Sequence, residues 1–292
     1  MRYIRSPCWQ QEGFVVSLAL YPHGAATVIG VYQGEEKMLA ILSRTGATLG
    51  AVCIGLAAWH VPGRADDAQL RDFLRKAATA IGGLQKIQQY PATISKGKGT
   101  FHGLGQPVAY TAEYIGVAAK RQRISFEGEV QGQKFSFVFV VDGDKGWIRV
   151  MDQVMEMTKD QLDNARAEMY ADYVTSLRFV EDKDIEVSSL GDVKVDNKPA
   201  VGIRVAKKDH PDVNLFFDPA SHLLLKAEYR VKNDMTGEEQ KQEVFFSDYR
   251  NVQGLKIPFK TKILRDGKPW VDGEIVEVKL YEKLGDEHFA KP

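Results

Sequence analysis

The chain has 292 residues, and its 39 basic residues balance its 39 acidic ones without a long tract of either sign. A nucleic-acid partner usually leaves a basic patch in the sequence, so this balance argues against one. Both cysteines, Cys8 and Cys53, precede residue 66. The chain after residue 65 therefore has no thiol for a disulfide, a thiolate metal site or a cysteine nucleophile.

Residues 38–65 have the parts of a secretory signal peptide. Arg44 supplies a basic start, residues 45–61 carry no Lys, Arg, Asp or Glu, and Gly63 and Ala65 are the small residues of a cleavage site. We expect cleavage after Ala65. Because the apolar run is close to the length of about 20 residues that spans a bilayer, an uncleaved anchor over 38–61 is one alternative, and a buried core helix is another.

Residues 1–37 stand in front of this segment and show no amphipathic period. Since a signal peptide works at an N-terminus, we interpret residues 1–37 as an over-extended, disordered start and Met38 as the true initiator. This interpretation predicts a periplasmic or otherwise exported protein, formed by one domain over residues 66–292 with no long linker inside it.

The first predicted element of that domain is a helix that begins at Asp66 or Asp67. Gly82 and Gly83 end it, as glycine often does just past a helix. Its apolar residues recur at helical spacing. They are Leu70, Phe73, Leu74, Ala77 and Ile81. Alternating residues and turns then predict strands over 94–101, 109–115, 123–130 and 134–141, after which a turn at 142–144 leads into residues 146–151.

A second helix is predicted by the capping box of Thr158 and Gln161. We expect its apolar stripe to be Leu162, Ala165, Met169 and Tyr173, with Asn164 and Glu168 on the opposite side. Strands follow over 201–205, 213–217, 223–231, 243–249, 255–264 and 270–281. A sheet with one solvated face must bury the other against something, and these two helices are the available cover.

The predicted fold class is therefore α+β, mainly β. We expect a strongly curved antiparallel sheet, roughly half a barrel, with the helices covering its concave face.

Several short motifs are spread over residues 66–292: Lys96 to Phe101, Asp142 to Trp147, Val195 to Gly202, Val213 to Asp218, Ser247 to Tyr249 and Phe289 to Pro292. In these motifs the chain resembles a group of secreted proteins that are labelled outer-membrane lipoprotein-sorting proteins and have the fold of the LolA/LolB-like lipoprotein carriers.

The resemblance implies an envelope protein that binds a lipid or the acyl chain of a lipoprotein between sheet and helices. Carriers of this kind hold their helical lid with an arginine on an early strand, which implies a lid contact for Arg121 or Arg123. Two strands are the expected groove wall, because residues spaced by two share a face. Their wall residues are Phe135, Phe137 and Phe139 on one strand and Val213, Leu215 and Phe217 on the other.

No catalytic signature is present. His102, His210, His222 and His288 are scattered without metal-ligand spacing, and no serine lies in a nucleophile elbow. We therefore expect no enzyme activity, metal or cofactor. An alternative to the carrier stays open: a non-catalytic structural or protein-interaction module of the envelope with a filled core. Contact with envelope proteins or with a membrane surface is compatible with either reading.

Overall fold

The computed structural model describes residues 67–292 except 104 and 234–236, together with the backbone of four two-residue strands nearer the N-terminus. These are β1 (Val16–Ser17), β2 (Leu20–Tyr21), β3 (Ala25–Ala26) and β4 (Ile29–Gly30). The expected signal peptide over 38–65, and residues 1–37 apart from these strands, lie outside the described residues. In the part of the chain that is described, no helix combines the length and apolarity that a membrane span requires.

One antiparallel sheet of 13 strands dominates the domain, in the order β10-β9-β8-β7-β6-β5-β17-β16-β15-β14-β13-β12-β11. It consists of two meanders, β5 to β10 and β11 to β17, which are joined where β5 pairs with β17. The strands that precede and follow α3, β10 and β11, are thus the two edges of the sheet.

The strands agree with the predicted ones where the residues alternate, whereas β10 and β11 were not predicted. Their bounds are β5 (Ala92–Phe101), β6 (Val108–Val117), β7 (Arg121–Val130), β8 (Gln133–Asp142), β9 (Lys145–Val150), β10 (Gln153–Glu156), β11 (Glu186–Val195), β12 (Lys198–Ala206), β13 (Val213–Phe217), β14 (Leu224–Lys232), β15 (Glu239–Val252), β16 (Leu255–Arg265) and β17 (Lys268–Tyr281).

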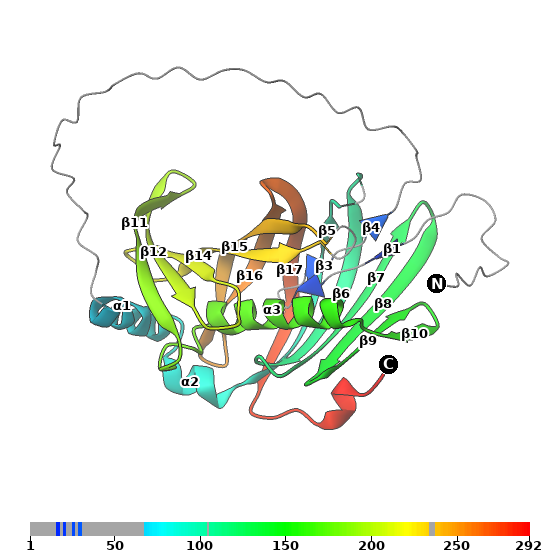
Figure 1. Cartoon of the computed structure of the whole chain (residues 1–292), viewed down its shortest axis with the longest axis horizontal. Helices are drawn as coiled ribbons and strands as arrows, with labels where there is room; N and C mark the ends of the chain where they lie inside the picture. Colours follow the sequence, from blue (N-terminus) through cyan, green and yellow to red (C-terminus); the bar gives the residue numbers. More distant parts are fainter. Residues whose placement is uncertain are drawn as a thin grey trace, which may run out of the picture.

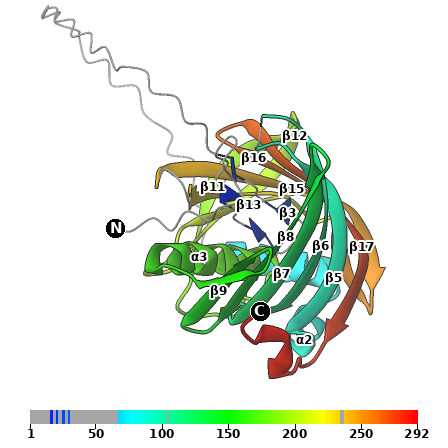
Figure 2. The same ribbon diagram turned by 90° about the vertical axis from the view of Figure 1, so that its right-hand side faces the viewer.

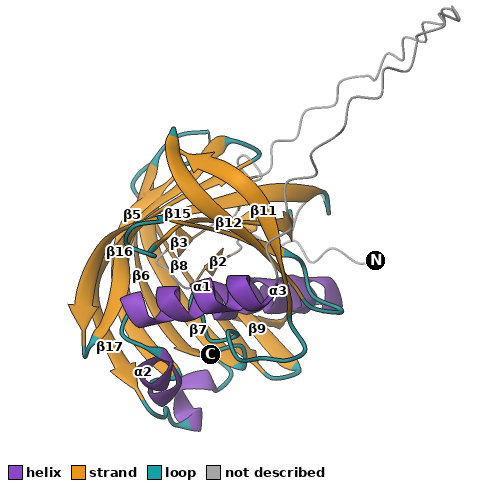
Figure 3. Ribbon diagram, turned by 90° about the vertical axis from the view of Figure 1, so that its left-hand side faces the viewer, coloured by secondary structure: helices purple, strands orange, loops and turns teal. Residues whose placement is uncertain are grey.

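Three α-helices are described: α1 (Asp67–Ala80), α2 (Leu84–Gln89) and α3 (Lys159–Thr175), with a final 3₁₀ turn, η1 (Asp286–Phe289). Helix α3 connects the two edges of the sheet and crosses its open side (Figure 1). Seen from either end of the molecule, the strands form a curved wall, with α1 and α3 along the opening (Figures 2 and 3). The predicted half-barrel, with helices covering its concave face, is confirmed.

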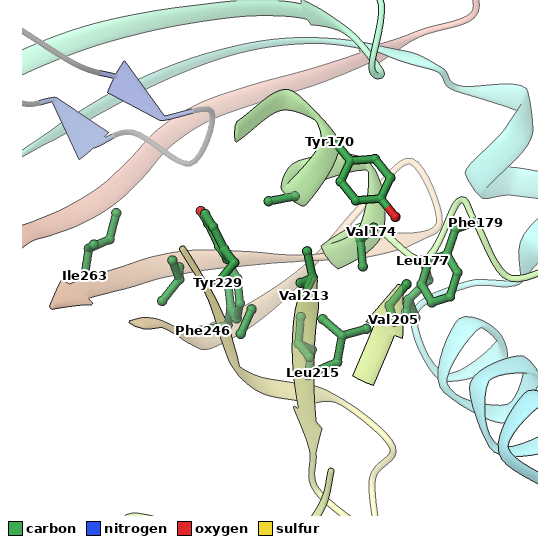
Figure 4. Close-up of a cluster of buried hydrophobic side chains, with 14 of the residues drawn as sticks. Tyr170, Val174, Leu177, Phe179, Val205, Val213, Leu215, Tyr229, Phe246 and Ile263 are labelled. Carbon is green, nitrogen blue, oxygen red and sulfur yellow. The ribbon is translucent and has the colours of Figure 1, made fainter. Parts of the chain in front are cut away.

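The main core lies between the concave face and these helices. Tyr170 and Val174 of α3 point toward Val213 and Leu215 of β13 and belong to one buried cluster with them (Figure 4). A smaller cluster lies on the convex face, where the C-terminal segment brings Phe289 against Val140 of β8.

The predicted stripe of α3 is correct in part: Met169 is buried and Tyr173 packs against the main core, whereas Leu162 and Ala165 are only partly buried. The residues that the helix buries are Asn164, Glu168, Met169, Tyr170, Ala171 and Val174. Asn164 is buried because its amide replaces a strand partner: Nδ2 donates to the Lys232 carbonyl, 3.3 Å away, and Oδ1 accepts from the Lys232 amide at 3.2 Å. Polarity alone therefore misassigned Asn164 and Glu168 to the solvent side.

Candidate functional site

A cavity of about 160 Å³ lies between the concave face of the sheet and the helices. Strands β5 and β6 form one wall and β14 to β17 the other, while α2 and the C-terminal half of α3 cover it. Most of the lining is apolar. Its apolar side chains include Ile87, Val117, Met169, Leu224, Phe246, Leu255, Ile275, Val278 and Leu280.

Three of the polar side chains that reach this cavity come from separate parts of the chain: Tyr114 from β6, Asp172 from α3 and Arg178 from the turn after α3. The other polar residues of the lining include Thr93, Ser95, Arg121, Tyr173, Tyr249 and Lys256. An apolar pocket with a few convergent polar groups is the usual form of a small-molecule site. The three groups influence one another, because Asp172 raises and Arg178 lowers the pKa of Tyr114, on top of a larger upward shift from burial.

Arg178 is placed by the backbone on both sides of it. Leu177 adopts the left-handed conformation, with φ at 60°, which turns the chain sharply after α3. The Arg178 guanidinium then donates to the carbonyl oxygens of Ile87 and Tyr90 at the end of α2, the second at 2.6 Å. Burial lowers the pKa of Arg178, which is the direction expected for a cation removed from water.

Asp172 points into the same cavity from α3. Burial, with a further contribution from Glu168 one turn earlier in the helix, raises the pKa of Asp172 well above its usual range. A carboxyl group shifted in this way holds its proton at higher pH and can then donate a hydrogen bond.

Tyr114 fits under the helices because Gly116 is beside it. A Cβ atom at residue 116 would come within 2.1 Å of the Tyr114 hydroxyl oxygen. Glycine at 116 therefore leaves the room in which the phenol lies.

A hydrogen-bonded network of three side chains, Tyr229, Gln242 and Arg265, lies on the concave face nearer the middle of α3. The Gln242 side chain donates to the Tyr229 hydroxyl at 2.9 Å, and Arg265 Nε donates to Gln242 Oε1 at 2.9 Å. The Arg265 guanidinium lies 4.5 Å from the centre of the Trp270 ring. This network gives the concave face polar character opposite Glu168 and Asp172, both of which influence the pKa of Tyr229.

The six predicted groove residues belong to the main core but do not line this cavity. Phe137 and Phe139 are buried on β8, and Phe135 beside them is partly buried. The other three, Val213, Leu215 and Phe217 on β13, are fully buried. The ring of Phe217 packs edge-on against Phe73 of α1, with 5.6 Å between ring centres. The phenylalanines of β8 and the residues of β13 therefore both lie on the concave face, in separate halves of the sheet.

The two arginines for which a lid contact was predicted, Arg121 and Arg123, lie on β7. Ile124 and Phe126 of β7 face the concave core, so Arg121 and Arg123, which alternate with them, face outward. Arg121 pairs with Asp286 at 2.5 Å and covers the ring of Phe289, 4.5 Å from its centre. Through these contacts Arg121 holds the C-terminal segment, and it also contributes to the lining of the cavity at the start of β7.

The contacts that do hold α3 come from elsewhere. Arg166 donates to the carbonyl oxygen of Gly143 and pairs with Asp144, Asn164 binds β14, and the Tyr173 hydroxyl donates to Asp182 at 2.7 Å. Of the polar residues in the cavity, Arg178 had a weak signal in the sequence, since it is the only charged residue in the otherwise apolar run from Leu177 to Val180.

A wider hollow of about 1,260 Å³ is lined mainly by outward-facing side chains of the strands. Lysines such as Lys98 and Lys260 alternate there with carboxylates such as Asp272 and Glu274. Neither sign dominates, so this surface has no clear charge preference. Among the described residues, no group of three or more His, Cys, Asp or Glu side chains is placed to hold a metal ion.

No protein-family model and no curated protein matches the sequence. Among solved structures, a LolA superfamily protein from Nitrosomonas europaea superimposes with a TM-score of 0.51 at 14% identity, covering 78% of this chain and 99% of that one. The fold is LolA-like. The resemblance predicted from the sequence motifs is thereby confirmed at the level of the fold.

Another similar structure is a putative outer membrane lipoprotein-sorting protein domain from Vibrio parahaemolyticus. Its TM-score is 0.49 at 10% identity, over 77% of this chain and 98% of that one. A DUF1329 family protein from Desulfovibrio piger follows, with a TM-score of 0.47 at 11% identity, over 75% of this chain and 96% of that one.

Proposed function

We propose that this protein is an exported, non-catalytic envelope protein that binds the apolar chain of a lipid or lipoprotein between its sheet and its helices. The observation that carries the proposal is the apolar cavity of about 160 Å³ beneath α2 and α3. Apolar cavities near 150 Å³ are known to stay dry and to accept small apolar ligands. Export would follow from cleavage after Ala65, which gives a mature chain beginning at Asp66.

The size of the cavity limits the ligand. Pockets for small molecules are commonly about 300–1,000 Å³, so the cavity as it stands holds only a short apolar chain. Each buried CH₂ contributes roughly 0.8 kcal/mol, so every added carbon should tighten binding about fourfold until the cavity is full. A longer acyl chain would require α3 to shift, and would then reach the walls formed by Phe137 on one side and Leu215 on the other.

The test is binding of a fluorescent fatty-acid probe to the wild type and to two variants of β5. Thr93 lines the cavity, whereas Thr100 on the same strand lines the outer hollow. We expect Thr93→Phe to fill the cavity and abolish probe binding, and Thr100→Phe to leave it unchanged. Equal binding by both variants, or no binding by the folded wild type, would favour the alternative of an interaction module with a filled core.

A further inference from the structure

Arg178 is a mostly buried cation without an acidic partner. Arginines at the surface pair with carboxylates: Arg75 with Glu181, Arg204 with Asp212 and Arg250 with Asp248. Within residues 67–103, 105–233 and 237–292, the hydrogen bonds of the Arg178 side chain go to two backbone carbonyls, and it forms no ion pair. Buried charges are normally paired, so this arrangement needs an explanation.

The end of α2 explains part of it. The last carbonyls of a helix lack partners within the helix and carry partial negative charge, which a guanidinium can satisfy. Helix α2 has only 6 residues, however, so it supplies no full counter-charge. A guanidinium has five N–H donors, and the two carbonyls leave donors for another acceptor.

The N–H donors of Arg178 that do not bind these two carbonyls belong to a guanidinium that lines the cavity. Arg178, Tyr114 and Asp172 all contribute to its lining. Burial raises the pKa of Asp172 well above its usual range, so its carboxyl group keeps its proton to higher pH than a solvated one and repels an anion less. Tyr114 likewise keeps its hydroxyl proton, since burial raises its pKa. Arg178 and Tyr114 therefore bring hydrogen-bond donors into a mostly apolar lining, to which the cations Arg121 and Lys256 also contribute.

We propose that the cavity selects a single-chain amphiphile with an anionic oxygen headgroup, a carboxylate or a phosphate, and that Arg178 is the partner of that headgroup. The proposal rests on the proposed apolar-chain site and adds the chemistry of its polar end. A cationic or uncharged headgroup would leave the buried guanidinium without a counter-charge, and an anion without an apolar chain would leave the cavity unfilled.

The experiment compares ligands that share one chain. Binding of octanoate, octyl phosphate, 1-octanol and octylamine to the purified protein is measured by calorimetry at pH 7, with acetate and inorganic phosphate as headgroups alone. We expect the two anionic amphiphiles to bind roughly 10- to 100-fold more tightly than 1-octanol, the range of one charge-assisted hydrogen-bonded contact. Octylamine and the free headgroups should bind more weakly than 1-octanol.

Arg178→Gln should remove the preference for anions while 1-octanol still binds, and Arg178→Lys should keep part of it. Arg250→Gln, which changes an exposed arginine on β15, is the matched control and should behave as the wild type. Should Arg178→Gln fail to fold, the Nε–H resonance of Arg178 in the wild type should still move with octanoate and not with 1-octanol.

The outcomes separate the two proposals. Equal binding of octanoate and 1-octanol by the wild type, or an anion preference that survives in Arg178→Gln, would overturn the headgroup assignment and leave the apolar-chain site intact. In that case Arg178 only caps α2, and its loss lowers the melting temperature alone. If no octyl compound binds, the proposed function fails, and the assignment fails with it.

Discussion

Helices α1 and α3 cover the same concave face, yet they are attached to it by different chemistry. The buried side chains of helix α1 are apolar, Leu70, Leu74, Ala77 and Ala78, and its polar contacts come from Arg71 and Arg75 at the rim of the helix. Helix α3 buries Asn164 and Glu168 beside its apolar residues, and the Asp172 carboxyl group points into the cavity. Apolar burial is favourable wherever water is excluded, whereas buried polar groups are favourable only with their partners in place. The attachment of α3 should therefore depend more strongly on geometry and pH than that of α1, whose buried side chains are all apolar.

The largest expected effect is on the apolar side of this comparison. Leu74 of α1 is fully buried. We expect Leu74→Ala to lower the free energy of unfolding by about 2–5 kcal/mol, since it removes buried methyl groups and leaves a cavity. Urea unfolding followed by circular dichroism measures it, with the exposed Lys76→Ala as the control on the same helix. A loss as small as that of the control would mean that α1 is loosely attached.

Asp172 should give the second effect, which depends on pH. The folded-state pKa of Asp172 is raised by burial, so the folded protein binds this proton more tightly than the unfolded chain does. Stability from this group is complete below the unfolded value of about 3.9 and is lost as pH rises toward the raised pKa. We expect Asp172→Asn to remove that loss, so that its melting temperature gains on the wild type between pH 4 and pH 8.

The test is whether the melting temperature of Asp172→Asn, relative to that of the wild type, rises with pH. A difference between Asp172→Asn and the wild type that stays constant with pH would show that the carboxyl group is ionised in both states. Asp248→Asn is a contrasting control, because hydrogen bonding to Arg250 lowers the pKa of Asp248. That variant should lose stability relative to the wild type as pH rises.

Asn164 tests the geometric side of the attachment. Its two hydrogen bonds with the Lys232 backbone act as a strand partner at the end of β14. Asn164→Ala removes both of these part-buried hydrogen bonds, which should cost about 1–3 kcal/mol in total. Hydrogen exchange of the Lys232 amide is the direct readout. Unchanged protection of that amide would show that Asn164 does not hold α3 to the sheet.

The sequence predicted the positions of the helices and strands better than it predicted which of their faces is buried. Strands with strict alternation, such as β8 and β13, are found where the sequence indicated them, because burial of one face imposes a period of two. Strand β11 was missed because its register shifts between Ser189 and Asp192, and this irregularity breaks the alternation. Helix α2 was missed because 6 residues are too few to show a helical period.

The candidate site was less predictable than the fold. Its polar groups come from β6, from α3 and from the turn after it, and only the tertiary fold brings Tyr114, Asp172 and Arg178 to one cavity. The predicted groove residues are indeed on the concave face, but the sequence does not specify how closely the helices pack over them. For Arg121 and Arg123, alternation sets which residues share a face and does not say which face is concave, so their lid contact stays a prediction.

The smallest expected effect concerns the start of α3, where the sequence and the structure agree. The Thr158 hydroxyl accepts from the Gln161 amide at 3.3 Å, and the Gln161 side chain accepts from the Thr158 amide at 2.9 Å, which completes the predicted capping box. We expect Thr158→Ala to cost about 1 kcal/mol, because the first turn loses its side-chain acceptor. Thr158→Ser, which keeps the hydroxyl, should restore most of that loss in urea unfolding. If α3 is held mainly by its cap, Thr158→Ala would instead approach the effect of Asn164→Ala, and the contacts with β14 would then be secondary to the local sequence.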